Sequence, residues 1–122
     1  MSVASTIAKT RALATRLTLF ASATETSSGT SSAISVRGYR ELFITLNCTA
    51  ASGTTPALAV LIQASDDGGT TWYPVPGGGF STLTTTGSQA GWIQGFGDTI
   101  RVLYTITGTT PSFTFAVKAI GK

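Results

Sequence analysis

The side chains best suited to chemistry in this sequence are five carboxylates and one thiol. Two carboxylates held on either side of a sugar can hydrolyse a glycosidic bond. Asp66 and Asp67 are adjacent, but they lie in a Gly-rich stretch where Asp is typical of turns, and the other three acids are distant in the sequence. No histidine is present to activate a hydroxyl or a thiol. We therefore expect no enzymatic activity and predict no catalytic residues.

The single thiol belongs to Cys48, which lies in an apolar run. We predict that it is a small buried core side chain, because free cysteine packs as a small hydrophobe. It cannot form a disulfide within the chain, and zinc sites need several Cys or His ligands, which the sequence lacks. We expect no metal site, no cofactor and no cofactor-binding residue.

Residues 65–72, with the sequence SDDGGTTW, have the spacing of a hydrogen-bonded turn. Five of them fit the pattern S-x-D-x-G-x-T-W: Ser65, Asp67, Gly69, Thr71 and Trp72. The Asp carboxylate can accept backbone N–H groups within the turn, Gly permits a positive φ, and Trp can pack where the next strand starts. We predict a structural turn at these five residues.

This pattern resembles the Asp-box of sialidases and other β-propellers, where it recurs once per blade and has a structural role. One copy in 122 residues is too little for a propeller. The resemblance therefore implies a stabilised hairpin with Trp72 as its anchor. The alternative is a carbohydrate platform made by aromatic rings at Trp72, Tyr73 or Trp92.

Charged residues make up 11% of the chain, and eight Lys and Arg give a net charge of +3. Five of these cations come early and are not interleaved with aromatic residues, as a platform for single-stranded nucleic acid requires. No apolar run reaches the roughly 20 residues of a membrane span, and a signal peptide is not indicated. We expect neither nucleic acid nor a membrane as partner. The small positive net charge fits two interpretations: scattered charges that keep the protein soluble, or contact with an acidic protein surface.

Alternation of apolar and polar residues predicts about eight or nine short strands. The strongest patterns cover residues 41–49, 58–64, 100–107 and 113–120, and weaker ones cover 16–26, 33–37, 71–75, 80–85 and 91–94. Many short strands at even spacing are typical of a sandwich or barrel. We predict an all-β, single-domain antiparallel β-sandwich that is jelly-roll-like. The second faces of the strong strands are rich in Thr, so another protein could cover them at a low desolvation cost.

A Gly-Thr-Thr-Pro segment occurs twice, at residues 53–56 and 108–111, each time between two apolar strands. Gly suits a turn, and Pro prevents ladder pairing before the next strand begins. We interpret the two segments as similar hairpins, one in each half of a structure with two facing sheets.

Four segments carry a resemblance to small β-sandwich proteins of tailed bacteriophages: residues 36–42, 49–56, 65–72 and 108–115. The resemblance spans residues 34–122 and implies a virion structural protein, assembled in the host cytoplasm. Of the roles it implies, we favour a capsid decoration (cement) protein that binds and stabilises the shell of major capsid protein. The alternatives are a tail or head-completion subunit, or a carbohydrate-binding fibre or adhesion module.

Residues 1–12 are small and mostly polar, which predicts an extended N-terminal arm ahead of a sandwich domain at 13–122. We expect Val3, Ile7, Arg11 and Arg16 to contact a partner. The partner would be the capsid or a sister copy, and the second case would give a homo-oligomer or a symmetric cluster on the virion.

Overall fold

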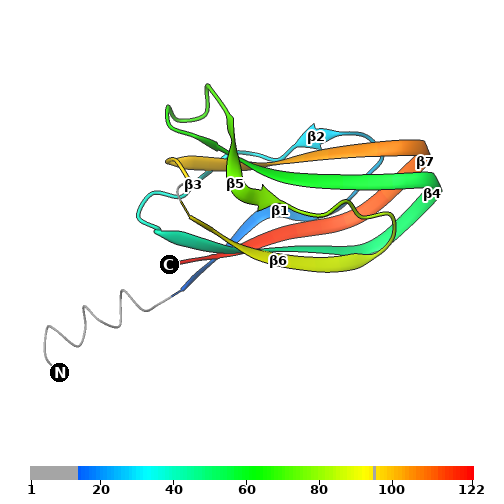
Figure 1. Cartoon of the computed structure of the whole chain (residues 1–122), viewed down its shortest axis with the longest axis horizontal. Helices are drawn as coiled ribbons and strands as arrows, with labels where there is room; N and C mark the ends of the chain where they lie inside the picture. Colours follow the sequence, from blue (N-terminus) through cyan, green and yellow to red (C-terminus); the bar gives the residue numbers. More distant parts are fainter. Residues whose placement is uncertain (1–13, 95) are drawn as a thin grey trace, which may run out of the picture.

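The computed structural model describes residues 14–94 and 96–122, and this part of the chain is built from antiparallel strands (Figure 1). The strands are β1 (Thr15–Glu25), β2 (Gly29–Thr30), β3 (Ile34–Ser35), β4 (Glu41–Ser65), β5 (Tyr73–Gly79), β6 (Gly87–Gln94) and β7 (Thr99–Gly121). In the described residues, no helix is long and apolar enough to cross a membrane.

The two long strands, β4 and β7, pair with each other along nearly their whole lengths. The pairing runs from Leu42 opposite Gly121 to Ser65 opposite Thr99, and both strands bend at its middle. Before and after the bend they belong to different layers, which Figure 1 shows one above the other. Each long strand thus contributes one half to each layer of the molecule.

One layer, called sheet I here, has the order β6, first half of β4, second half of β7, β1. The other, sheet II, has the order β5, second half of β4, first half of β7, then β2 and β3 together. Two four-stranded antiparallel sheets connected in this way are a jelly roll. The predicted all-β antiparallel sandwich is confirmed.

The core lies between the two sheets and consists of side chains from alternate positions of the strands. Sheet I contributes Leu42, Ile44 and Leu46, and sheet II contributes Leu58 and Ile62, all exposed by 1% or less. Burying each such side chain contributes about 1.5–3 kcal/mol. The core therefore joins the sheets through many alternating positions rather than through one anchor.

Cys48 is buried in sheet I, as the sequence predicted. Burial raises the pKa of its thiol, although the contact with the Ala50 carbonyl oxygen partly opposes this shift. A buried thiol with a raised pKa is a poor nucleophile. Cys48 is a packing residue.

The two Gly-Thr-Thr-Pro segments are not hairpins, and that prediction is wrong. They are the bends of β4 and β7, and they lie against each other, with Thr54 opposite Thr109. Gly53 and Gly108 adopt φ values of +117° and +124°. A Cβ on Gly53 would lie 2.8 Å from the Thr110 carbonyl oxygen, and one on Gly108 would lie 2.9 Å from that of Thr55. Both bends need glycine, because the backbone of each bend occupies the space that a side chain on the other bend would need.

The strand predictions differ from the structure at other places too. Residues 80–85 hold only an isolated bridge between Leu83 and Leu58, residues 71–72 precede β5, and the two-residue strand β2 was not predicted. The short side strands depend on contacts with distant segments, which periodicity does not report. The predicted arm, residues 1–12, lies outside the described residues.

Candidate functional site

The loop at residues 65–72 is organised by Ser65, which is buried at the end of β4. Its Oγ donates a hydrogen bond to Asp67 Oδ1 at 2.6 Å and accepts the backbone N–H of Gly69 at 2.8 Å. Its carbonyl oxygen accepts the N–H of Asp98 at 2.9 Å. Ser65 therefore ties the loop both to itself and to the segment that enters β7.

Asp67 closes the loop through one carboxylate oxygen. Besides the Ser65 hydroxyl, Oδ1 accepts the backbone N–H groups of Thr70 and Thr71, each at 3.0 Å. The Ser65 hydrogen bond, followed by the backbone bond from Thr71, holds the pKa of Asp67 well below its usual range. Donors that favour the charged form keep the carboxylate ionised and engaged with its own loop. This arrangement suits a structural role.

Trp72 anchors the loop to sheet II. Its indole Nε1 donates to the Gly69 carbonyl oxygen at 3.1 Å. The Arg101 guanidinium lies 4.3 Å from the ring centroid, and Arg101 Nε donates to Gln63 Oε1 at 2.8 Å. A cation over a tryptophan face is a favourable contact, and here it occupies that face. Trp72 is half-buried, so little of its ring is left for a ligand.

The aromatic residues considered for a carbohydrate platform are divided between the two sheets. Trp72 and Tyr73 stand at the start of β5 in sheet II, whereas Trp92 lies on β6 in sheet I. Tyr73 and Trp92 expose 54% and 51% of their surface. The three rings are not aligned on one sheet.

An apolar row crosses the outer face of sheet I. It consists of Trp92, Phe43 and Ile120, which lie opposite one another on β6, β4 and β7. The Phe43 and Trp92 ring centroids are 5.0 Å apart. The row is formed by the register of three strands, which the sequence pattern alone does not contain.

Arg16 is the predicted partner-contact residue that the structure describes. It is exposed on β1 and lies opposite Ile120, at the end of the apolar row. A shallow groove of about 360 Å³ runs beside it on this face, with Phe43, Lys118 and Ile120 in its lining. Val3, Ile7 and Arg11 lie outside the described residues.

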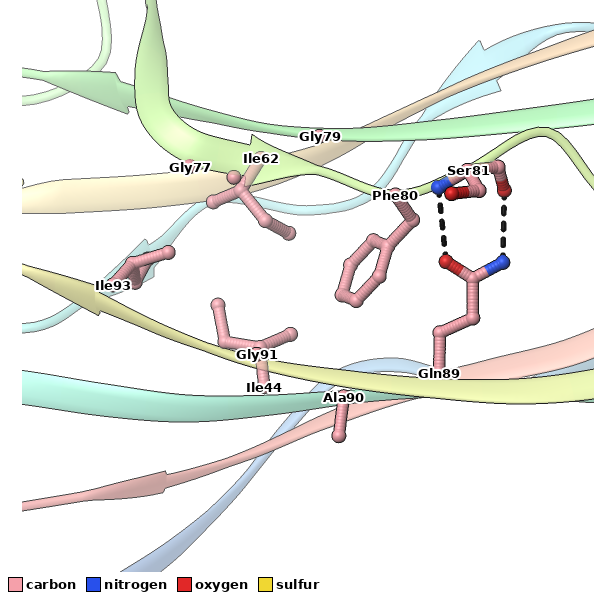
Figure 2. Close-up of a pocket in the computed structure, with 11 residues that line it drawn as sticks. Ile44, Ile62, Gly77, Gly79, Phe80, Ser81, Gln89, Ala90, Gly91 and Ile93 are labelled. Carbon is pink, nitrogen blue, oxygen red and sulfur yellow. Dashed lines mark hydrogen bonds between the residues drawn. The ribbon is translucent and has the colours of Figure 1, made fainter.

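A smaller pocket of about 130 Å³ opens between the sheets at the β5–β6 side, and Figure 2 shows its lining. The Gln89 side chain accepts the N–H of Ser81 and donates to the Ser81 carbonyl oxygen, both at 2.9 Å (Figure 2). The rest of the lining is apolar or glycine, including Ile44, Ile62 and Phe80. The Gln89 side chain therefore makes the two backbone hydrogen bonds that a neighbouring strand would otherwise make with Ser81. We assign the pocket to packing between the sheets.

Among residues 14–94 and 96–122, no three His, Cys, Asp or Glu side chains gather as a metal site would require. In the same part of the chain, an ion pair joins Arg37 Nη2 to Asp98 Oδ2 at 3.3 Å. Asp98 also accepts the Thr99 hydroxyl, which is the main reason that its pKa is lowered. This ion pair links the loop between β3 and β4 to the loop that leads into β7.

No protein-family model matches the chain, and no curated protein sequence matches it. Solved structures share its fold. The SPBc2 prophage-derived protein YomS aligns with a TM-score of 0.51 and 18% identity, over 88% of this chain and 93% of YomS. A chain from infectious bursal disease virus Gx strain aligns with a TM-score of 0.52 and 13% identity, over 89% of this chain and 32% of the viral chain. At these identities the likeness establishes the fold.

Proposed function

We propose that this protein is a non-enzymatic structural subunit of a tailed-bacteriophage virion, and specifically a capsid decoration protein bound to the major capsid protein. The observation that carries the proposal is the apolar row on the outer face of sheet I, in which Trp92 is exposed and Phe43 and Ile120 are half-buried. An exposed apolar patch with a polar surround is typical of a protein-interaction surface. The likeness to a prophage-derived protein over nearly the full length of both chains supports a phage origin.

The action of such a subunit is mechanical. A copy that bridges neighbouring shell subunits binds the assembled state and not the dissociated one, so it stabilises the assembly by mass action. A stable contact of this kind buries about 1,600 Å² in total. No step of this mechanism needs a catalytic group or a cofactor.

The N-terminal segment is proposed as a tether to the shell or to a sister copy. It leads directly into Arg16, which stands beside the apolar row. A variant that lacks residues 1–12 is expected to lose most of its occupancy on shells. Undiminished occupancy would contradict the tether.

A carbohydrate-binding module is the second candidate, and the exposure of Tyr73 and Trp92 favours it. Exposed aromatic rings can stack on sugar faces, in addition to their role at protein interfaces. A glycan array separates the two proposals. Selective glycan binding that is lost in Tyr73→Ala or Trp92→Ala would favour the module.

Gel densitometry of purified virions tests the decoration role. The phage whose genome encodes the chain is purified, and the band of this protein is compared with that of the major capsid protein. A decoration protein gives a copy number close to that of the shell subunits, whereas a tail or head-completion subunit gives a ring of about six or twelve. Absence from the virion overturns the proposal.

A further inference from the structure

The outer face of sheet I combines the apolar row with positive charge. Arg16 continues the row on β1, and Lys118 and Lys122 lie two residues to either side of Ile120, hence on the same face of the sheet. All three cations are exposed. Lys122 Nζ lies 5.4 Å from the Trp92 ring centroid. We call this set the sheet I face: Arg16, Phe43, Trp92, Lys118, Ile120 and Lys122.

Negative charge is scarce on this face. Glu41 lies two residues before Phe43, and its Oε2 accepts a hydrogen bond from Gln94 Nε2 at 3.1 Å. Three of the other acids belong to the loops around residues 66–67 and 98, and the fourth, Glu25, ends β1. The sheet I face is therefore an apolar centre bordered by three cations and one carboxylate.

We infer that the sheet I face docks onto an acidic protein surface with an apolar centre. The inference deepens the proposed function and rests on it: the partner is an acidic patch of the shell protein. Interfaces that bind tightly place aromatic anchors at the centre and polar groups around them. Opposite charge at the rim steers the encounter and fixes the orientation.

The same charges disfavour a second copy of this chain. Packing two sheet I faces together would place Arg16, Lys118 and Lys122 against their own copies, and like charges across an interface are costly. The N-terminal segment of a neighbour would also bring cations, Lys9 and Arg11. Neither occupant supplies the acidic groups that this face lacks.

Nucleic acid is also disfavoured, although Lys122 lies beside the Trp92 ring. Stacking of bases needs open ring faces. Phe43 packs against Trp92 with an angle of 50° between the rings, and Lys122 lies over the Trp92 ring. The two rings are therefore tilted against each other and do not form a flat surface on which bases could stack.

Rebinding to shells tests the inference. Shells of the phage that encodes the chain are stripped of this protein, and the affinity of added purified protein is measured at low and high salt. Trp92→Ala is expected to weaken binding about 10-fold or more. The double variant Lys118→Gln/Lys122→Gln is expected to weaken it and to flatten its salt dependence. Tyr73→Ala, which removes an equally exposed ring of sheet II, and the charge-retaining Lys118→Arg/Lys122→Arg serve as controls that bind normally.

The outcomes separate the two proposals. Wild-type protein that fails to rebind shells overturns the proposed function, and the inference with it. Normal wild-type binding that survives Trp92→Ala and the double Gln variant overturns the inference alone. Two further results also overturn it: a dimer in sedimentation that Trp92→Ala dissociates, and tight binding of a single-stranded oligonucleotide that the double Gln variant abolishes.

Discussion

Asp67 shows how one carboxylate can hold a loop without being a reactive group. Its Oδ1 accepts three hydrogen bonds from Ser65, Thr70 and Thr71, so the loop depends on this atom. Asp66 is adjacent and also exposed, and it provides a natural comparison.

Replacing Asp67 with Ala is expected to lower the melting temperature, because Ser65 Oγ and two backbone N–H groups lose their acceptor. Replacing Asp66 with Ala should change the melting temperature by about 3 °C or less, because surface substitutions usually change the unfolding free energy by about 0.5 kcal/mol or less. Differential scanning calorimetry measures both. Equal melting temperatures for the two variants would contradict the role given to Asp67.

The lowered pKa of Asp67 gives its contribution a defined pH dependence. The folded state binds the proton more weakly than the unfolded state, whose ordinary value is 3.8. The stabilisation is therefore complete above about pH 5 and is lost as pH falls through the folded pKa. The difference in unfolding free energy between wild type and Asp67→Asn should be constant from about pH 7 to 5 and shrink below pH 4, in urea titrations. A difference that grows in acid would refute this.

The two candidate sites differ in how far sequence could predict them. The hydrogen bonds of residues 65–72 join near neighbours in the chain, so their spacing predicted which atoms could meet. The sheet I face draws Arg16, Phe43, Trp92 and Ile120 from four strands. Strand order and register decide that meeting, and periodicity contains neither.

At the scale of elements, the paired bends of β4 and β7 are the most constrained part of the fold. Besides the two glycines, Thr55 and Thr110 adopt positive φ values of 46° and 48°, which β-branched residues rarely do. The sequence shows the repeat and a glycine suited to an unusual backbone conformation in each copy, but the predicted hairpin turns are bends within β4 and β7. Its partner was not visible, because each segment crosses the other rather than closing a local hairpin.

Gly53→Ala and Gly108→Ala should each destabilise the protein by about 1–3 kcal/mol, since the new Cβ meets backbone and φ is positive. Gly91→Ala is the matched control, because its Cβ would meet no atom within 4 Å. Chemical denaturation measures all three variants. Gly53→Ala and Gly108→Ala should lower the free energy of unfolding by similar amounts, because the two glycines have similar φ values and similar backbone neighbours. An equally large decrease in Gly91→Ala would argue against the steric role of the two bends.

Thr55→Gly and Thr110→Gly should raise stability by about 1 kcal/mol or less, because glycine relieves the left-handed conformation at some entropic cost. Each Thr hydroxyl donates only to the carbonyl of the preceding residue, so little is lost with it. The same denaturation series measures this. Destabilisation in both variants would show that the Thr side chains contribute packing at the bend.

At the scale of the whole molecule, β4 and β7 make the two sheets thermodynamically one unit. The central pairs of both sheets belong to the same two strands, and the two sheets share one core, so opening either sheet exposes the inner face of the other. We expect a single unfolding transition. Trp72 fluorescence in a Trp92→Phe background reports on sheet II, and thiol labelling of Cys48 reports on sheet I. Coincident midpoints in denaturant are expected, and separate midpoints would show that the sheets open independently.

The pairing of β1 with the end of β7 also determines how the molecule responds to tension. Thr15 lies directly opposite Gly121, and the two strands are antiparallel. A force applied between these two residues pulls perpendicular to the strands and opens the ladder one hydrogen bond at a time, beginning with this pair. A force applied along β4 would load many ladder bonds of its neighbours at once. The sandwich is therefore mechanically anisotropic: it yields easily to a force between Thr15 and Gly121 and resists a force along its shared strands.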